Sequence, residues 1–430
     1  MNRRRGTGRT AGVLAAAACL AVSLPGGARA AGDVGGYAFD DGARQVKGAV
    51  STLDAAQLEP EKSYRDTIGK NGKLYYRVDL DSERDAYVSV VAVPKGAGKV
   101  AYGDGIKVSM QDGSHTQCGY QDTSFGPAEF ARPLTAYAHR TLTPGSSSCR
   151  HAGAYYVLVE RDSAVASDPG AWELEIRFLT EPGVRRSGPT ALPENWASGT
   201  PQPPSGGPQR RQGGAGFQGA TSLRQGEWRT DIRPGQTLFY RVPVDWGQQL
   251  FADAELGSSP DGDAFVGNAF VLSLENPARG HVDRDSLSYG GDPATLELDP
   301  RRPVAYENRF SSNDGTNGMR FAGWYTLSAT LSPEVAEAYG DQPLPLTLRV
   351  NVTGQPKAAP AYAGPAGPFT VTDADRDAAA SGQSAPEAAR SDVLRVVGVA
   401  GIGAGTVLLL GLGTWWLLAR RAAGAGPMPG

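Results

Sequence analysis

The chain has 430 residues, with 42 Lys or Arg side chains against 45 Asp or Glu side chains, so its formal net charge is only −3. A chain with so balanced a charge has no strong electrostatic field for recruiting nucleic acid, which excludes nucleic acid as a partner. The length predicts two or three domains that are each large enough to bury a hydrophobic core.

Residues 1–30 have the organisation of a secretory signal peptide. An arginine cluster at positions 3–5 precedes an apolar run from Val13 to Leu24, and small residues follow up to Ala30. We expect the chain to be exported and cleaved after Ala30. Lipid attachment at Cys19 is an alternative, but the apolar stretch before this cysteine is very short.

Residues 31–183 are predicted to form a first domain of antiparallel β-strands. Leu74, Tyr76 and Val78 alternate with residues of the opposite face, which is the period of a half-buried strand. Short segments of this kind are separated by turn dipeptides such as the Asp-Gly at 104–105, and no long amphipathic helix lies between them. This pattern favours a β-sandwich of jelly-roll type.

Cys118 and Cys149 are the two cysteines outside the signal peptide. In an oxidising compartment such a pair is expected to form a disulfide, and closing the loop between them would contribute about 3 to 4 kcal/mol. Metal binding is the alternative, although two cysteines without a CxxC spacing make a weak site. The disulfide would also bring His115 and His151 close together, and a metal ion could then bridge these two histidines; the alternative is that they are loop residues beside the disulfide.

A second domain follows a linker. Residues 184–216 are rich in Pro, Gly, Ser and Arg, which predicts a flexible linker. Residues 217–355 then repeat the strand pattern and are predicted to form a second β-sandwich. In each domain one aromatic ring points away from the predicted core, so we expect Tyr75 and Phe239 to be exposed and to contact a ligand such as a sugar.

The C-terminal part is predicted to be a stalk over residues 356–392, followed by a transmembrane helix over residues 396–419. The stalk is rich in Ala, Pro, Asp and Ser, and the helix carries no charged residue. The predicted helix is long enough to cross a hydrocarbon core of about 30 Å. Arg420 and Arg421 begin a cytoplasmic tail, residues 420–430, so we expect a type I protein of the cell membrane with its bulk outside.

The two predicted sandwiches are copies of one internal repeat. The strand motif Leu-Tyr-Tyr-Arg-Val at 74–78 matches Leu-Phe-Tyr-Arg-Val at 238–242. The closing strands of the two copies carry Arg177 and Arg349 at matching positions. Such a repeat indicates one structural unit that is used twice.

The order of the motifs within each copy resembles a known family. A turn, a glycine, Leu-Tyr-Tyr-Arg-Val, an alternating strand, the Gly-x-Tyr segments at 153–158 and 323–327, and a final strand are similar to the bacterial pre-peptidase C-terminal domain family. The likeness covers roughly residues 45–181 and 217–353. It implies a β-sandwich that binds calcium or an extracellular polymer, whereas the residues themselves predict no cofactor. The chain is also similar to secreted actinobacterial membrane proteins.

The sequence carries no recognisable catalytic constellation. It has four histidines and none of the HExxH, GxSxG, SxxK or phosphate-loop motifs. Acidic pairs such as Asp261 with Asp263 and Asp283 with Asp285 lie among Gly, Ser and Arg, so we interpret them as solvated turn residues rather than as an acid–base pair or a calcium site. We therefore predict no catalytic and no metal-binding residue.

These patterns together predict a noncatalytic, membrane-anchored extracytoplasmic protein. Two β-sandwich binding modules would face a cell-wall polymer or a partner membrane protein. One alternative is an accessory or sensor subunit of a membrane complex, paired through the GxxxG spacing of Gly401 and Gly405. The other alternative is an enzyme whose site is not recognised.

Overall fold

The computed structural model describes residues 36–96, 98–142, 148–186, 188–259 and 264–423, with the backbone alone described for 392–407 and 421–423. The predicted signal peptide, residues 1–30, and the acidic pair Asp261 and Asp263 therefore lie outside the described residues. The described residues form mostly β-strands, which confirms the predicted all-β class.

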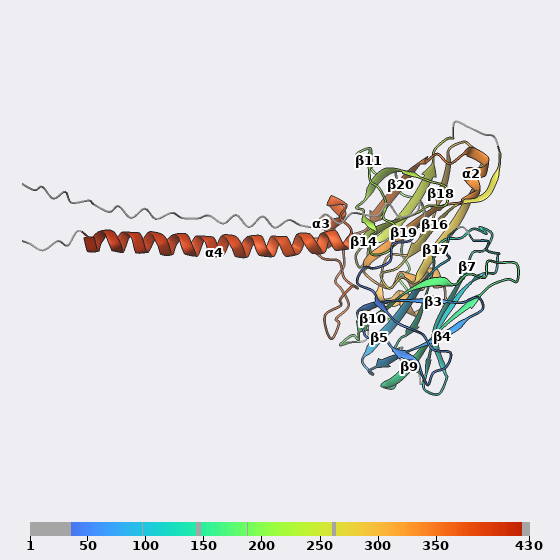
Figure 1. Cartoon of the computed structure of the whole chain (residues 1–430), viewed down its shortest axis with the longest axis horizontal. Coiled ribbons are helices and arrows are strands. Elements are labelled where there is room, and N and C mark those ends of the chain that lie inside the picture. Colours follow the sequence, from blue (N-terminus) through green and yellow to red (C-terminus); the bar gives the residue numbers. More distant parts are fainter. Residues whose placement is uncertain (1–35, 97, 143–147, 187, 260–263, 424–430) are drawn as a thin grey trace, which may run out of the picture. The chain divides into compact units, whose positions relative to one another are not determined.

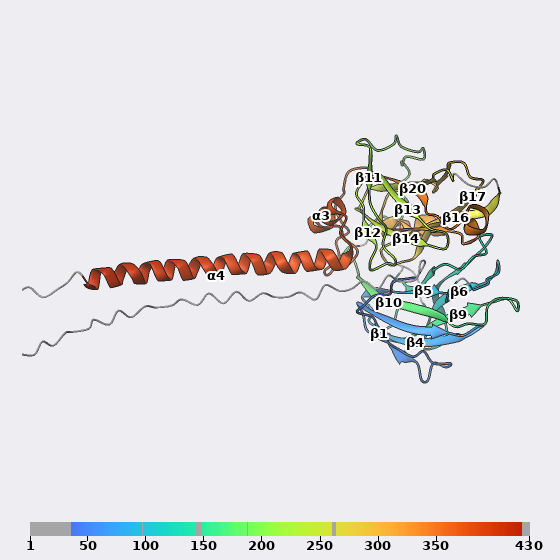
Figure 2. The same cartoon turned by 45° about the horizontal axis from the view of Figure 1, so that its top comes forward.

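Strands β1 to β10 form sandwich 1 (Figure 2). Sheet 1A has the strand order β1, β3, β10, β5, β8, and sheet 1B has the order β2, β4, β9, β6, β7. The strands of sheet 1A are β1 (Arg44–Gln45), β3 (Lys62–Ile68), β5 (Arg84–Val93), β8 (Leu134–Arg140) and β10 (Trp172–Pro182). Those of sheet 1B are β2 (Ala56–Gln57), β4 (Lys73–Leu80), β6 (Gly105–Asp112), β7 (Gln117–Ser124) and β9 (Gly153–Asp162).

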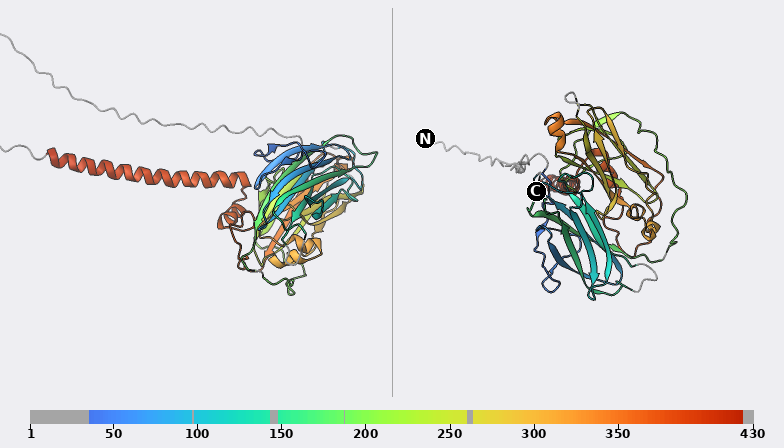
Figure 3. Two further views of the ribbon diagram at one scale, coloured as in Figure 1. Left: turned by 90° about the horizontal axis from the view of Figure 1, so that it is seen from below. Right: turned by 90° about the vertical axis from the view of Figure 1, so that its right-hand side faces the viewer.

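Strands β11 to β20 form sandwich 2, whose strands run from green to orange in Figure 3. Sheet 2A has the order β11, β13, β20, β15, β18, and sheet 2B has the order β12, β14, β19, β16, β17. The strands of sheet 2A are β11 (Pro208–Arg210), β13 (Gly226–Ile232), β15 (Gln249–Leu256), β18 (Ala294–Glu297) and β20 (Leu344–Thr353). Those of sheet 2B are β12 (Thr221–Ser222), β14 (Thr237–Val244), β16 (Val266–Glu275), β17 (His281–Tyr289) and β19 (Gly323–Leu331).

The two sandwiches have the same topology. Raising each strand number of sandwich 1 by ten gives the strand order of sandwich 2, so the structure confirms the internal repeat. The orders β3, β10, β5, β8 and β4, β9, β6, β7 are those of the two four-stranded sheets of a jelly roll. Strands β1 and β2 extend these sheets by pairing in parallel with β3 and β4.

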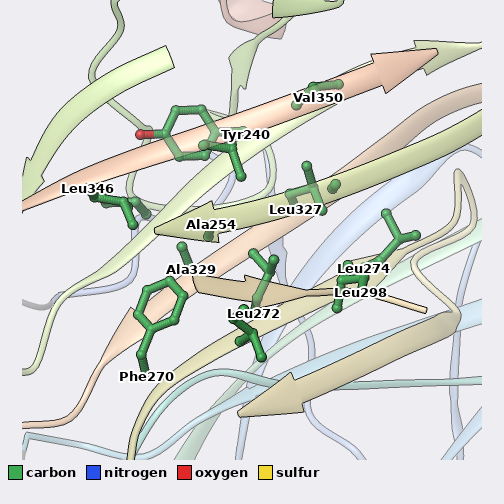
Figure 4. Packing of buried hydrophobic residues seen from close by; sticks show 14 of the residues in the cluster. Tyr240, Ala254, Phe270, Leu272, Leu274, Leu298, Leu327, Ala329, Leu346 and Val350 are labelled. Carbon is green, nitrogen blue, oxygen red and sulfur yellow. The ribbon is translucent and has the colours of Figure 1, made fainter. Parts of the chain in front are cut away.

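Each sandwich has its own hydrophobic core between its two sheets. In sandwich 2, Leu238, Tyr240 and Val242 point inward from β14 and pack with residues of both sheets. Figure 4 shows Tyr240, Leu327 and Leu272 of sheet 2B beside Leu346 and Val350 of sheet 2A. The corresponding residues of sandwich 1 form a separate cluster, so each copy of the repeat buries its alternating apolar face in the same way.

Cys118 of β7 and Cys149 form the predicted disulfide, with their Cα atoms 5.7 Å apart. Both residues contact the core of sandwich 1. The bond therefore joins the edge strand of sheet 1B to the loop that leads into β9, and it closes a loop with a sequence separation of 31 residues.

The outer face of sheet 1A packs against the outer face of sheet 2B, and we call this contact the seam. Val91 of β5 lies in one cluster with Phe217 and Phe239, and Val271 of β16 packs with Phe130. Phe239 points away from its own core, as the alternation predicts, but only 1% of it is exposed. The prediction of an exposed ring at this position is therefore wrong, because sandwich 1 covers it.

The linker and the stalk both lie against the sandwiches. The predicted linker contributes β11 to sheet 2A, and its Arg185 N donates to the carbonyl of Ala361 at 2.8 Å. In the predicted stalk, Thr372 caps α3 (Asp373–Ser381) through a capping box with Asp375. This helix contacts β12 and β14. Local polar pairing thus orders a segment whose composition alone predicts flexibility.

The other helices are short except for the last one. They are η1 (Tyr306–Phe310), α1 (Asp314–Gly318) and α2 (Glu334–Tyr339), and the last helix is α4 (Ala385–Ala423). Figure 1 shows α4 as one unbroken helix after α3. Among the described residues no helix is long and apolar enough to cross a membrane. Within the predicted span the side chains up to residue 407, where Gly401 and Gly405 stand, lie outside the described part.

Candidate functional site

Buried ion pairs cross the seam beside its apolar clusters. Arg309 of η1 reaches from sandwich 2 to Asp85 and Glu181 of sandwich 1, with N–O distances of 3.0 and 2.7 Å. The hydroxyls of Tyr87 and Tyr362 also donate to the Glu181 carboxylate, at 2.8 and 2.7 Å. The Glu181 carboxylate is 1% exposed, so these three partners replace the water that it would otherwise bind.

The pKa values of this group follow from its burial. Burial and the neighbouring Glu181 raise the pKa of Asp85, and Arg309 offsets part of that rise. Burial alone would lower the pKa of Arg309, but Glu181 and the other acidic groups around it hold that pKa well above its usual value. The guanidinium therefore stays charged at all physiological pH values and forms ion pairs with two carboxylates.

A second buried pair lies at another point of the seam. Arg279 of sandwich 2 donates to Glu175 of β10 at 2.5 Å, and the two side chains are 5% and 0% exposed. The other oxygen of Glu175 accepts from the backbone N of Asp40 at 2.8 Å. At both points sandwich 1 supplies the carboxylates and sandwich 2 supplies the guanidinium group. Such paired charges specify one orientation of two surfaces, because any shift leaves a buried charge without its partner.

A cleft opens at the edge of the seam, and we call it the seam cleft. It consists of two adjoining cavities of about 450 and 320 Å³. Val184, Gly188, Pro189 and Tyr306 line both of them. The walls come from every part of the body: Glu83 and Asp85 of sandwich 1, the predicted linker, Trp246 and Tyr306 of sandwich 2, and the stalk segment Lys357–Ala361.

The side chains of the seam cleft suit a ligand with both polar groups and apolar faces. Arg186 and Lys357 are exposed basic residues on its walls, and Glu307 adds an acidic group. Trp246 is 4% exposed, and its indole Nε1 has no hydrogen-bond partner among the described residues. Clefts of several hundred Å³ that combine aromatic rings with a few polar groups are typical of ligand sites.

The predicted site residues are placed as follows. Tyr75 is half-buried on the outer face of sheet 1B. His115 approaches the side chain of Gln111, and His151 accepts a hydrogen bond from Tyr155 on its carbonyl. Within the described ranges no group of three or more His, Cys, Asp or Glu side chains is arranged to hold a metal ion.

The seam was not predicted, although β5 carries a signal for it. Residues 86–93 are apolar at almost every position, and all of β5 from Asp85 to Ala92 is buried. A strand that is apolar on both faces is covered on both faces, whereas a strand facing solvent alternates. The seam cleft itself has no such signal, since its walls come from segments that lie far apart in the chain.

The sequence matches no protein-family model and no curated protein. Tripeptidyl peptidase 2 shares 8% identity and a TM-score of 0.20 over 69% of this chain, which spans only 24% of that protein. The tandem CBM22 domains of Paenibacillus barcinonensis Xyn10C share 12% identity and a TM-score of 0.17, covering 65% of this chain and 82% of theirs. The ANXUR1 extracellular domain of Arabidopsis thaliana shares 10% identity and a TM-score of 0.20, covering 71% of this chain and 92% of its own. Likenesses this weak assign no family.

Proposed function

We propose that this protein is a noncatalytic, membrane-anchored surface protein whose two sandwiches act as one body and bind a cell-wall polymer in the seam cleft. The observation that carries the proposal is the composition of the cleft. Its walls come from both sandwiches, the linker and the stalk, and they combine Trp246 and Tyr306 with the charges of Arg186 and Lys357. Aromatic faces beside polar groups suit a chain of sugar rings with charged substituents.

The anchor in this proposal is the C-terminal half of α4. Its large apolar side chains from Leu408 to Leu418, including Trp415 and Trp416, are each more than half exposed. An apolar surface of this size costs free energy in water and is stabilised by lipid. The Arg420 guanidinium lies 4.1 Å from the ring centroid of Trp416. Tryptophan is enriched at membrane interfaces, and arginine is enriched in the cytoplasmic flanks of membrane helices.

Sedimentation with insoluble cell-wall material tests the ligand. The full-length protein in detergent is expected to sediment with the wall, and the double variant Arg186→Glu, Lys357→Glu is expected to bind at least tenfold more weakly. The matched control is Lys47→Glu, Arg224→Glu, which makes the same charge change on exposed residues outside the cleft. Equal binding by both double variants would contradict the assignment of the cleft.

Membrane fractionation tests the anchor separately. The full chain should remain with membranes after a high-salt wash, and a chain that ends after Gln383 should be found in the soluble fraction. If both chains fractionate alike, α4 is not the anchor, whatever the wall-binding experiment shows.

A further inference from the structure

Sandwich 1 contains a buried arginine whose guanidinium group is left almost without partners. Arg140 is the last residue of β8 and stands opposite Ala86 in the register of sheet 1A. Ala86 and Ala138 belong to the core, so Arg140 points inward at the end of the core, where its guanidinium lies 5.4 Å from the ring centroid of Tyr155. Its exposed fraction is 0%.

The hydrogen bonds of Arg140 fall far short of its capacity. A guanidinium group has five N–H donors. Among the described residues, Arg140 uses one of them, from Nη2 to the carbonyl of Asp81, and its Nε and Nη1 have no partner. No carboxylate of the described chain forms an ion pair with it.

Two other buried arginines of sandwich 1 show how the fold usually satisfies this group. Arg132 donates to the carbonyls of Ala128, Phe130 and Phe125 at 2.7 to 3.2 Å. Arg161 donates to three carbonyls and to the Ser163 hydroxyl. Arg140 differs from both, and it lies on a cavity of about 200 Å³ that it lines together with Pro60, Thr180 and several aspartates.

Each of these aspartates forms an ion pair with an arginine other than Arg140. Asp81 pairs with Arg84 at 3.0 Å, and Asp85 pairs with Arg309 across the seam. Asp79 pairs with Arg77 at 2.9 Å and accepts from Gln57. Arg140 is therefore the one charge on this cavity wall, within the described chain, that no opposite charge contacts.

We propose that the cavity at Arg140 binds a small oxyanion, either inorganic phosphate or a carboxylate group. Burying a guanidinium with most of its donors unused costs free energy, and burial lowers the pKa of Arg140 for the same reason. An oxyanion would accept from Nε and Nη1 and would neutralise the charge. Arginine is the side chain best suited to hold such groups, because its planar fork matches their geometry.

Equilibrium dialysis of the full-length protein in detergent with radiolabelled phosphate, at constant chloride, tests the site. We expect one phosphate per chain, and binding reduced to background in Arg140→Leu. Arg210→Leu, which removes an exposed arginine of sandwich 2, should bind like the unchanged protein. Displacement of the phosphate by acetate would identify a carboxylate group as the natural occupant, and no displacement would identify phosphate.

Two results would overturn the site. One is the lack of saturable binding of both phosphate and acetate to the folded protein, which would mean that water satisfies Arg140. The other is equal binding by Arg140→Leu. If the leucine variant does not fold, Arg140→Lys replaces it, since lysine keeps the charge but loses the fork. Affinity at least tenfold weaker then supports the site, and unchanged affinity excludes it.

Discussion

Single residues show where alternation is a sound guide and where it fails. The alternation correctly placed Tyr240 in the core and the ring of Phe239 on the opposite face. It could not show that another surface covers Phe239, because periodicity reports on one strand and not on what lies beyond it. Buried charged groups such as Glu181 and Arg309 have no local signal at all, since their partners are more than a hundred residues away.

Glu275 at the end of β16 is expected to make the stability depend on pH. Burial raises its pKa to about 8, and Arg284 offsets part of that rise. An unfolded glutamate titrates near pH ~4.3, so between that pH and about 8 the folded chain holds one proton more than the unfolded chain. The stabilisation that Glu275 gives the folded chain through this proton therefore has its full value below pH ~4.3, and it is lost as the pH rises to about 8.

Urea unfolding of Glu275→Gln at pH 5 and pH 8.5 checks this expectation. The variant should equal the unchanged protein at the lower pH within about 1 kcal/mol and exceed it at the higher pH, because glutamine never acquires the buried charge. Burial lowers the pKa of the nearby His281 to about 4, which acts in the opposite direction, so the comparison is made at equal pH. A variant that is less stable at pH 8.5 would refute the protonated state of Glu275.

At the scale of elements, the strands that carry the repeated motifs could be predicted, but the surfaces that cover them could not. Period-two alternation identified β4 and β14, and the repeat predicted that both copies share one topology. Composition could not predict that the stalk residues form an ordered helix. Helix α3 depends on the N-cap at Thr372 and on tertiary hydrogen bonds such as the one from Trp324 Nε1 to Asp375. Composition reports the average tendency of a segment and not its specific partners.

The disulfide is expected to stabilise sandwich 1 through its loop. Replacing Cys118 and Cys149 together by serine should lower the free energy of unfolding by about 3 to 4 kcal/mol, because the unfolded chain regains the freedom of a 31-residue loop. Urea unfolding under nonreducing conditions measures the difference. The addition of reductant should bring the unchanged protein to the level of the variant, and an unchanged midpoint in reductant would contradict the loop argument.

At the scale of the whole molecule, the seam makes two homologous domains into one body. A flexible linker and a free stalk would predict independent modules, whereas the structure places Arg309, Tyr362 and Phe369 against sandwich 1. The seam cleft exists only because these parts meet, so it could not be predicted from either sandwich alone. Sequence patterns predict the strands of each domain. They do not predict which two surfaces pair, because this pairing depends on the shapes and charges of both surfaces together.

We expect the two sandwiches to unfold in one cooperative transition. Arg309→Ala leaves Asp85 and Glu181 buried without their cation, which should cost about 3 to 5 kcal/mol and separate the two unfolding steps. Scanning calorimetry on the full chain measures the number of transitions. Arg44→Ala breaks an ion pair that is more than half exposed and should cost under ~1 kcal/mol. Two transitions in the unchanged protein would show that the seam does not couple the domains.

The seam joins unlike faces of two related units, and this bears on self-assembly. Sandwich 1 joins the seam through sheet 1A, and sandwich 2 joins it through sheet 2B. Sheet 2A, which corresponds to sheet 1A in the repeat, and sheet 1B, which corresponds to sheet 2B, take no part in the seam. Contacts of this head-to-tail kind have no inherent end and can grow into fibres. By the strand register of the two copies, Val91 of sheet 1A corresponds to Glu255 of sheet 2A. The seam buries Val91, whereas the Glu255 carboxylate forms an ion pair with Arg349 at 2.6 Å. A charged side chain at this position costs free energy to bury, so we expect it to disfavour the addition of a further unit at this face.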